Sequence, residues 1–371
     1  MAKLKVLLTS GIYPPDKGGP AHFVSSYSKW LAKSGVDTSV LSLTDQDSTN
    51  KEDAGVKVSL ISRRHMLPIR FSLASISIAK PLAKKRVILM NGLFLETLLA
   101  QVISRARLVA KVPGDIVWER ARNQGLTNLT IDQYQGKEHG GKKLFRFLFT
   151  KSLGKANHII APSLHLKHLI ESWGINSEKI SVIRNSVDTE LFAPDVSISK
   201  RFDVITVCRL VPWKGVDELI NECSKRDLSL AVVGDGPERS NLEKLAQGQS
   251  GCNVTFFGDV PHENLPALLN ASKIFVLNSH YEGSPHSLIE ALSIGMAAIA
   301  RESTGSAEVI NDSENGLLSG KSRSLGDSID LLMKDSALIE RLQRGARTTA
   351  LAEYDQELNF KRIKSVLEGA L

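Results

Sequence analysis

Glu282 and Glu290 are the residues of this chain whose type and spacing first suggest chemistry. They stand eight positions apart in the stretch VLNSHYEGSPHSLIEALSIG, residues 276–295. Residues 274–277 are apolar and predict a buried parallel strand, and the polar residues 278–283 predict the loop at its carboxyl end. Open α/β sheets bind their ligands at such loops, so we expect the two carboxylates on two walls of one pocket.

A helix is predicted to begin directly after this loop. Ser284 has the chemistry of an N-cap, Pro285 suits the first helical position, and Gly295 suits the C-cap. The N–H groups at the helix start, here those of His286 and Ser287, carry partial positive charge and can bind a diphosphate. A diphosphate beside carboxylates that accept from hydroxyls describes a nucleotide sugar. Two solvated surface glutamates are the alternative interpretation.

Two cations follow an earlier predicted strand in the stretch CRLVPWKG, residues 208–215. Arg209 offers a planar fork to phosphate oxygens and Lys214 a mobile point charge, a pairing that suits two bridged phosphates. Gly234 in a GDGP turn and Val260 after a glycine and an aspartate follow two further predicted strands. Because the carboxyl ends of parallel strands lie at one edge of a sheet, we expect these loops to converge.

These motifs together resemble those of the retaining glycosyltransferases of family 4, whose architecture is called GT-B. The resemblance spans nearly the whole chain and rests on EGSPHSLIE, RLVPWKG, GDGP, DKGGP and VIRNSVDTELF, which occur in the order that the family shows. It implies an α/β fold of two doubly wound Rossmann-like domains facing each other across a cleft. It also implies transfer of a sugar from a nucleotide-diphosphate sugar to an acceptor hydroxyl by attack on the face that the diphosphate leaves.

The resemblance assigns roles to single residues. It implies that Glu282 holds the hydroxyls of the donor sugar and that Glu290 binds the ribose. Arg209 and Lys214 would stabilise the charge that grows on the leaving diphosphate. The expected donor site comprises Gly18, Gly19, Arg209, Lys214, Gly234, Val260, Glu282, Gly283, Ser284, Pro285, His286, Ser287, Leu288 and Glu290.

No cofactor beyond the nucleotide sugar is expected. The predicted second domain has no Asp-x-Asp motif beside a strand end, and Arg209 with Lys214 supplies the positive charge that a divalent metal would otherwise bring. A GxGxxG turn after a strand, which a nicotinamide dehydrogenase needs, is absent from the sequence. An epimerase of the same fold and a non-catalytic protein that binds sugar nucleotides are the alternatives to a transferase.

Asp115 lies where the chain departs from the family pattern. Many members carry a histidine before this aspartate, and Gly114 stands in its place here. We expect Asp115 to orient the acceptor hydroxyl while the leaving phosphate acts as base, or else to cap the next helix. Trp118 and Glu119 are further candidates for lining the acceptor cleft.

Strand and helix patterns alternate twice along the chain, which is typical of two doubly wound domains. In the first half, the apolar runs predict strands near residues 5–9, 38–43, 56–61, 87–90, 108–112 and 158–161. The alternation lapses around residues 189–201, where a proline and small polar residues predict a linker. We expect an acceptor-binding domain at 1–190 and a nucleotide-sugar domain at 191–354. The resemblance implies that a last helix, residues 355–371, crosses back to the first domain.

The two halves of the chain differ in charge. Residues 1–193 hold 28 Lys and Arg against 15 Asp and Glu, whereas the remainder holds 19 against 25. A basic first domain favours an anionic partner: a lipid-linked or otherwise charged glycan acceptor, or an anionic membrane face. The run GKKLFRFLFTK, residues 141–151, mixes cations with large apolar residues and suits a membrane surface, or else packs into the core. Arg63, Arg64 and the run 84–86 are candidate extensions.

Composition agrees with a cytoplasmic enzyme that can attach to the cytoplasmic face of a membrane. The chain has 371 residues and 42% hydrophobic content, enough for two cores. It contains no apolar run of the length that a membrane span needs, and its three cysteines are scattered. Nucleic-acid binding is not expected, because no aromatic and basic motif accompanies the basic pI. The family's usual work suggests a glycolipid or surface-polysaccharide pathway.

Overall fold

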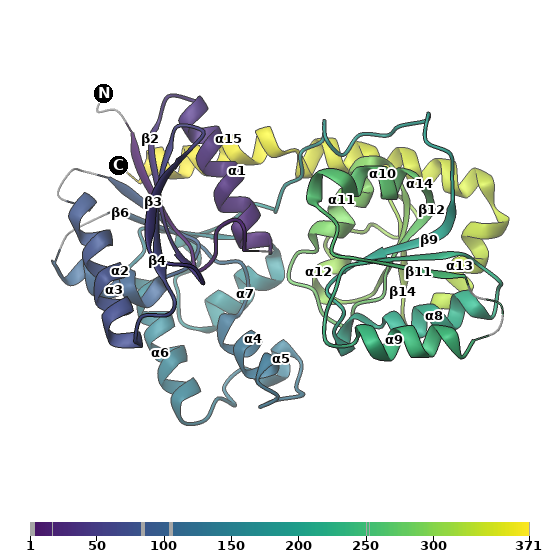
Figure 1. The fold of residues 1–371 in the computed structure, drawn as a ribbon, viewed down its shortest axis with the longest axis horizontal. Helices are drawn as coiled ribbons and strands as arrows, with labels where there is room; N and C mark the ends of the chain where they lie inside the picture. Colours follow the sequence, from purple (N-terminus) through teal and green to yellow (C-terminus); the bar gives the residue numbers. More distant parts are fainter. Residues whose placement is uncertain are drawn as a thin grey trace. The chain divides into compact units, whose positions relative to one another are not determined.

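The computed structural model describes residues 4–16, 18–82, 86–103, 107–249, 251 and 253–370. The chain forms two compact α/β units (Figure 1), Met1–Ile183 with Phe360–Leu371 as unit 1 and Arg184–Asn359 as unit 2. In the described part of the chain, no helix is both long and apolar enough to cross a membrane.

The two segments that connect the units are tied to each other inside unit 2. Val187 N donates to Tyr354 O at 2.9 Å, and Gln356 N donates to Val187 O at 3.0 Å. The predicted breaks after residues 190 and 354 therefore fall within unit 2, because this pairing holds residues 184–190 and 355–359 against it.

Unit 1 contains an eight-stranded sheet in the order β3-β4-β2-β1-β5-β6-β7-β8. All its neighbouring strands are parallel except β3, which is antiparallel to β4. The strands are β1 (Lys5–Thr9), β2 (Asp37–Thr44), β3 (Thr49–Asp53), β4 (Val56–Ser62), β5 (Val87–Met90), β6 (Arg107–Lys111), β7 (His158–Ala161) and β8 (Ile180–Val182). The apolar runs predicted six of them, but β3 reads TNKED and β8 has three residues, so neither carries a hydrophobic pattern.

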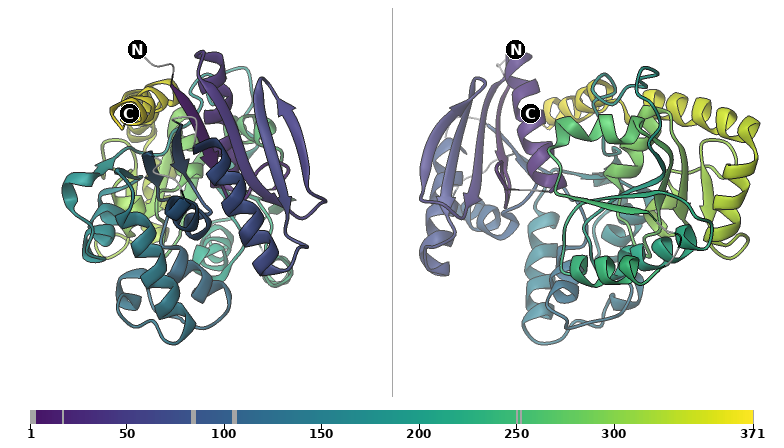
Figure 2. Two further views of the ribbon diagram at one scale, coloured as in Figure 1. Left: turned by 90° about the vertical axis from the view of Figure 1, so that its left-hand side faces the viewer. Right: turned by 45° about the vertical axis from the view of Figure 1, so that its right-hand side comes forward.

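The helices of unit 1 cover both faces of this sheet, as Figure 2 shows from two further sides. They are α1 (Gly19–Lys33), α2 (Leu67–Leu82), α3 (Phe94–Ile103), α4 (Ile116–Asn123), α5 (Ile131–Tyr134), α6 (Gly141–Gly154), α7 (Leu164–Ser172) and α15 (Gln356–Gly369). The chain passes from β1 to β2 on one side and reaches β5 on the other, so the topological switch point lies between β1 and β5.

Unit 2 contains a six-stranded parallel sheet in the order β11-β10-β9-β12-β13-β14. Its strands are β9 (Phe202–Val207), β10 (Leu230–Val233), β11 (Val254–Gly258), β12 (Ser272–Leu277), β13 (Ala297–Arg301) and β14 (Leu317–Ser319). Its helical segments are η2 (Pro212–Lys214), α8 (Val216–Ser224), α9 (Arg239–Gln247), η3 (His262–Asn264), α10 (Leu265–Asn270), α11 (His286–Ile294), α12 (Thr304–Ala307), α13 (Leu325–Lys334) and α14 (Ser336–Thr349).

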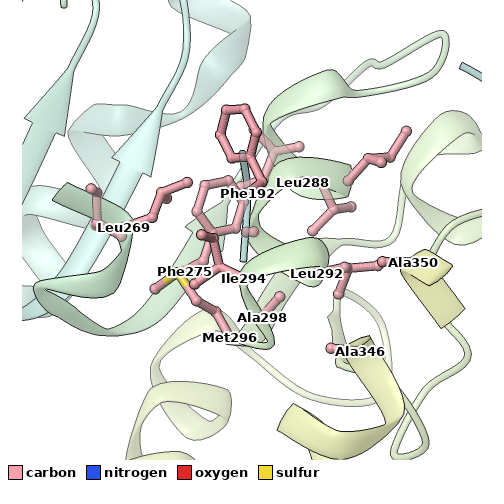
Figure 3. Packing of buried hydrophobic residues seen from close by; sticks show 14 of the residues in the cluster. Phe192, Leu269, Phe275, Leu288, Leu292, Ile294, Met296, Ala298, Ala346 and Ala350 are labelled. Carbon is pink, nitrogen blue, oxygen red and sulfur yellow. The ribbon is translucent and has the colours of Figure 1, made fainter. Parts of the chain in front are cut away.

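The core of unit 2 lies on both faces of its sheet because successive side chains of a strand point to opposite faces. On β12, Phe275 packs with Phe192 and Leu288 in one cluster, whereas Ile274 packs into the other. Figure 3 shows the first cluster, in which Leu292 of α11 meets Ala346 and Ala350. Seven of the nine residues of α11 are buried, which fixes the start of this helix at the carboxyl edge of the sheet.

Helix α15 packs into the core of unit 1 through several buried residues, among them Phe360. The centroid of the Phe360 ring lies 4.9 Å from the ring centroid of Tyr27, 5.8 Å from that of Trp30 and 6.2 Å from that of Phe23. All three of these residues belong to α1. Both Figures 1 and 2 show α15 beside α1. The chain end thus completes the core of the unit in which the chain began.

We predict that Phe360→Ala lowers the free energy of unfolding by about 3–5 kcal/mol, because it removes a buried ring from this cluster. Ser365→Ala, at an exposed position of the same helix, should change it by less than about 0.5 kcal/mol. Urea unfolding followed by tryptophan fluorescence measures both. Equal midpoints for the two variants would contradict the role given to α15.

Candidate functional site

Two loops at the carboxyl edge of the unit 2 sheet are joined by hydrogen bonds. His280 N donates to Trp213 O at 2.9 Å, and Asn278 Nδ2 donates to Gly215 O at 2.9 Å. These bonds link the loop after β9 to the loop after β12. The cationic loop and the first glutamate loop therefore converge, as the sequence predicts.

Gly215 allows these two loops to approach. Its φ is +61°, and a Cβ at this position would lie 2.6 Å from Asn278 O. Asn278 is itself fixed, because its amide donates to Glu218 Oε2 at 2.9 Å and accepts from Arg301 Nε at 3.0 Å. Any larger residue at 215 would push the loop that carries Lys214 away from Asn278.

Lys214 and Glu282 form an ion pair across the joined loops. Both side chains are largely buried, with 15% and 13% of their surfaces exposed. The sequence motifs assign them separately, one to phosphate and the other to sugar hydroxyls, and do not predict their contact. Arg209, at the same edge, is exposed. Lys214 is thus paired at this edge, whereas Arg209 is exposed.

The loops after β10 and β11 reach the same edge. Leu210 N donates to Asp235 O at 2.9 Å, and Gly234 N donates to Gly258 O at 2.8 Å. Val260, two residues after Gly258, is partly buried and packs against the core. All four predicted loops thus lie side by side.

Helix α11 begins one residue later than predicted. Pro285 is the N-cap, and Ser284 lies before it with no capping bond from its side chain. The first intrahelical bond runs from Ile289 N to Pro285 O at 3.2 Å, so the N–H groups of His286, Ser287 and Leu288 precede it. Gly283 links Glu282 to this start, and the helix ends at Gly295 as predicted.

Glu290 is paired with a histidine that no sequence motif indicates. His262 Nε2 lies 2.9 Å from Glu290 Oε1, and 8% of Glu290 is exposed. No motif signals this pair, because the two residues are 28 positions apart on different elements. The only hint in the sequence is a histidine soon after a predicted strand end.

In unit 1, Gly18 is the exposed N-cap of α1 and Gly19 its first residue. The predicted glycine loop therefore stands at a helix start after β1. Asp115, expected to face an acceptor, instead has no exposed surface. Its Oδ1 accepts from Val117 N at 3.0 Å and from Trp118 N at 3.2 Å. Asp115 was expected either to orient the acceptor hydroxyl or to cap the next helix. Its geometry fits the cap of α4.

The other oxygen of Asp115 binds a buried arginine. Oδ2 accepts from Arg146 at 2.6 Å and from Gln135 Nε2 at 2.9 Å. Arg146 also donates to Glu138 at 2.9 Å and stacks on Trp173. Arg146 belongs to the run 141–151, whose cations were expected at a membrane surface. Its guanidinium instead points inward.

Glu119 lies directly over Gly114. A Cβ added to Gly114 would meet Glu119 Oε1 at 2.3 Å, so this conformation of Glu119 requires glycine there. The side chain keeps exposed surface, while desolvation by the surrounding chain and the charge of Asp115 raise its pKa to about 7. Glu119 is thus the carboxylate that remains accessible at the end of β6.

The described residues contain no group of three or more His, Cys, Asp and Glu side chains that could hold a metal ion. Cys208 borders the site, and its burial raises the pKa of its thiol to about 11. Arg209, Lys214 and the start of α11 bring positive charge to the unit 2 edge.

Two sequence families match this chain over adjacent regions. "Glycosyltransferase Family 4" matches residues 17–191, and "Glycosyl transferases group 1" matches residues 188–349. An uncharacterized glycosyltransferase of Methanocaldococcus jannaschii is 26% identical over 248 residues, 61% of this chain and 63% of the relative. The N,N'-diacetylbacillosaminyl-diphospho-undecaprenol alpha-1,3-N-acetylgalactosaminyltransferase of Campylobacter jejuni is 31% identical over 199 residues, 52% of each chain. The chain thus spans less than two thirds of the length of these curated relatives.

Solved structures share the fold over nearly the full length. Anabaena HepE in complex with UDP and glucose has a TM-score of 0.78 at 19% identity, covering 99% of this chain and 100% of that one. Sucrose-phosphate synthase from Thermosynechococcus elongatus has a TM-score of 0.80 at 17% identity, covering 99% of each. The predicted GT-B fold is confirmed.

We predict that Asp115→Ala destabilises unit 1 by about 3–5 kcal/mol, because it leaves the buried Arg146 without one of its charge partners. Asp47→Ala removes the exposed partner of Arg64 and should cost less than about 1 kcal/mol. Urea unfolding followed by tryptophan fluorescence compares them. If Asp115→Ala unfolds like Asp47→Ala, the buried network does not hold α4 and α6.

Proposed function

We propose that the protein transfers a sugar from a nucleotide-diphosphate sugar to an acceptor hydroxyl and retains the anomeric configuration of that sugar. The chain belongs to the group 1 glycosyltransferases of family 4. The observation that carries this proposal is the convergence of Arg209, Lys214, Glu282 and the start of α11 at one edge of the unit 2 sheet. Cations and helix N–H groups suit a diphosphate, and carboxylates suit hydroxyls.

The Lys214–Glu282 pair suits a site that must bind both an anion and a polyol. Lys214 can direct its ammonium to the diphosphate, and Glu282 then accepts hydrogen bonds from the hydroxyls of the donor sugar. Arg209 is exposed and offers a second, planar contact to phosphate oxygens. We propose that these two cations meet the diphosphate charge without a metal ion.

The transfer itself consists of one bond exchange. The acceptor oxygen bonds to the anomeric carbon, the bond from that carbon to the diphosphate oxygen breaks, and the acceptor proton passes to the departing diphosphate. Arg209, Lys214 and the N–H groups of His286 and Ser287 stabilise the charge that grows on the diphosphate. Because attack and departure share one face of the sugar, the configuration is retained.

The acceptor proposed is a lipid-linked glycan. The Campylobacter jejuni relative is named for a diphospho-undecaprenol-linked sugar acceptor, and residues 1–193 of this chain carry an excess of positive charge that suits such an anion. Glu119 is the carboxylate proposed to accept the hydrogen bond of the acceptor hydroxyl. Asp115 supports α4, which carries Glu119, and acts as a positioning residue.

A mixed apolar and basic surface on unit 1 supports contact with an anionic membrane. Helix α3 contacts both α2 and α6, so the three helices lie side by side (Figure 1). Leu67, Ile69, Leu73 and Ile76 of α2 are exposed, as is Met66 directly before this helix, and on α6 Leu144 and Phe147 are 60% and 55% exposed. Exposed Lys143 and Lys151 flank the α6 pair. This surface suits the interfacial region of a bilayer. Lysines 84 and 85, a proposed extension, lie outside the described residues.

We predict that a nucleoside diphosphate of one base stabilises the protein against heat, by about 2.7 kcal/mol at a concentration 100 times its Kd. UDP, GDP, ADP, CMP and their sugar conjugates form the panel, with UDP first because HepE is solved with it. Lys214→Ala and Glu290→Ala should abolish most of the shift. Lys273→Ala, at the amino-terminal part of β12, is the control.

The same proteins can then be assayed for sugar release and transfer. Lys214→Ala should lower the rate about a hundredfold or more, because it removes a charge that stabilises the leaving group. Retention is measured from the anomeric configuration of the product by NMR. An inverted product would refute retention, and donor binding without any turnover would favour the non-catalytic alternative.

We predict that the protein sediments with vesicles rich in phosphatidylglycerol at about 50 mM salt and is released at about 500 mM. Leu144→Asp with Phe147→Asp should reduce binding at least about tenfold, since it places charges on the apolar surface of α6. Leu164→Asp, at a comparably exposed leucine of α7, is the control. Equal binding of both variants would exclude α6 from the contact.

A further inference from the structure

His262, which is half-buried, and Glu290, which is buried, form a pair beside the proposed donor site. His262 belongs to η3, shortly after β11, and Glu290 belongs to α11, whose start faces the loop with Glu282. The ring nitrogen Nε2 lies 2.9 Å from Glu290 Oε1. The pair thus couples the loop after β11 to the helix that the diphosphate is proposed to cap.

The imidazole is held in place from its other side. Its ring centroid lies 5.0 Å from that of Phe192, a fully buried residue of the core cluster in unit 2. Phe192 O in turn accepts from Ser293 Oγ at 2.8 Å, on the same helix as Glu290. The packing against Phe192 therefore holds the imidazole plane of His262 in the orientation of its hydrogen bond to Glu290.

This bond leaves Glu290 with one oxygen for a ligand. Oε1 is occupied by His262, and among the described residues no donor reaches Oε2. A carboxylate whose first oxygen is fixed presents the second in one orientation. Two adjacent hydroxyls of a ribose are the donors that such an oxygen can accept from.

We propose that His262 is a positioning residue that orients Glu290 toward the ribose hydroxyls of the donor and couples nucleotide binding to pH. The inference rests on the proposed function, because it takes the edge of unit 2 as the donor site. His262 itself need not touch the nucleotide.

The charges around His262 determine the direction of the pH effect. Desolvation lowers its pKa, but the hydrogen bond and charge of Glu290, with the charges of Glu263 and Asp188, outweigh this and raise the pKa above its ordinary value. Below that pKa the imidazolium balances Glu290. As pH rises through it, the positive charge is lost and Glu290 repels the incoming diphosphate, so nucleotide affinity should fall.

The experiment measures the Kd of UDP and of 2′-deoxy-UDP by calorimetry between about pH 5.5 and pH 9, a range that brackets histidine titration. If the nucleotide panel selects another base, the corresponding diphosphate pair is used. The wild-type protein should prefer the ribose form at least about tenfold, since the deoxy analogue lacks one of the two hydroxyls that can donate to Glu290 Oε2. His262→Ala should lose most of that preference.

His262→Gln separates the hydrogen bond from the charge. A glutamine amide can still donate to Glu290, so this variant should keep the ribose preference but lose the pH dependence that is specific to wild type. Titration of the nucleotide phosphate is common to both proteins and cancels in the ratio of their Kd values. NMR titration of the His262 ring should show a pKa that falls in Glu290→Gln.

His165→Gln is the matched control, because His165 pairs with Asp132 at 2.8 Å in unit 1. It should bind both nucleotides like wild type. An unchanged ribose preference and pH slope in a folded His262→Ala would overturn the inference while leaving the proposed function intact. Failure of the wild-type protein to bind any nucleoside diphosphate would overturn both.

Discussion

The contact between Gly215 and Asn278 is the constraint on which the candidate donor site depends. Asn278 directly follows the buried strand β12 and is fixed by Glu218 and Arg301, so it cannot yield to a neighbouring side chain. Only a residue without a Cβ lets the loop after β9 approach it. That approach brings Lys214 to Glu282, and four strand ends can then present their loops to one ligand.

Buried charge has different roles in the two units. In unit 1, Asp115 pairs with Arg146 and this contact holds α4 against α6, at the cost of desolvating both charges. In unit 2, the Lys214–Glu282 and His262–Glu290 pairs lie at a sheet edge. Their side chains can therefore replace some of their contacts with each other by contacts with a ligand. The proposed chemistry therefore involves the two ion pairs of unit 2, whose side chains keep some surface for a ligand.

Much of the fold follows from local patterns. Apolar runs predicted the six longer or more hydrophobic strands of unit 1, because a strand buried on both faces must be apolar. They did not predict β3, whose residues are polar, because its backbone pairs along β4 at the exposed edge. The predicted helix start at Ser284 was displaced by one residue, since local propensity cannot distinguish two adjacent capping positions.

The sequence by itself determined most element types, the order of the loops and the family, because these depend on composition and short spacings. Only the tertiary structure decided which side chains meet. Lys214 and Glu282 are 68 positions apart, and Asp115 and Arg146 are 31 apart, distances at which no periodicity relates two residues. The packing of helices on each sheet brought them together, turned Asp115 inward and left Glu119 accessible. A side chain's chemistry follows from that packing, because its charge partners and its exposure are set by neighbours that are distant along the chain.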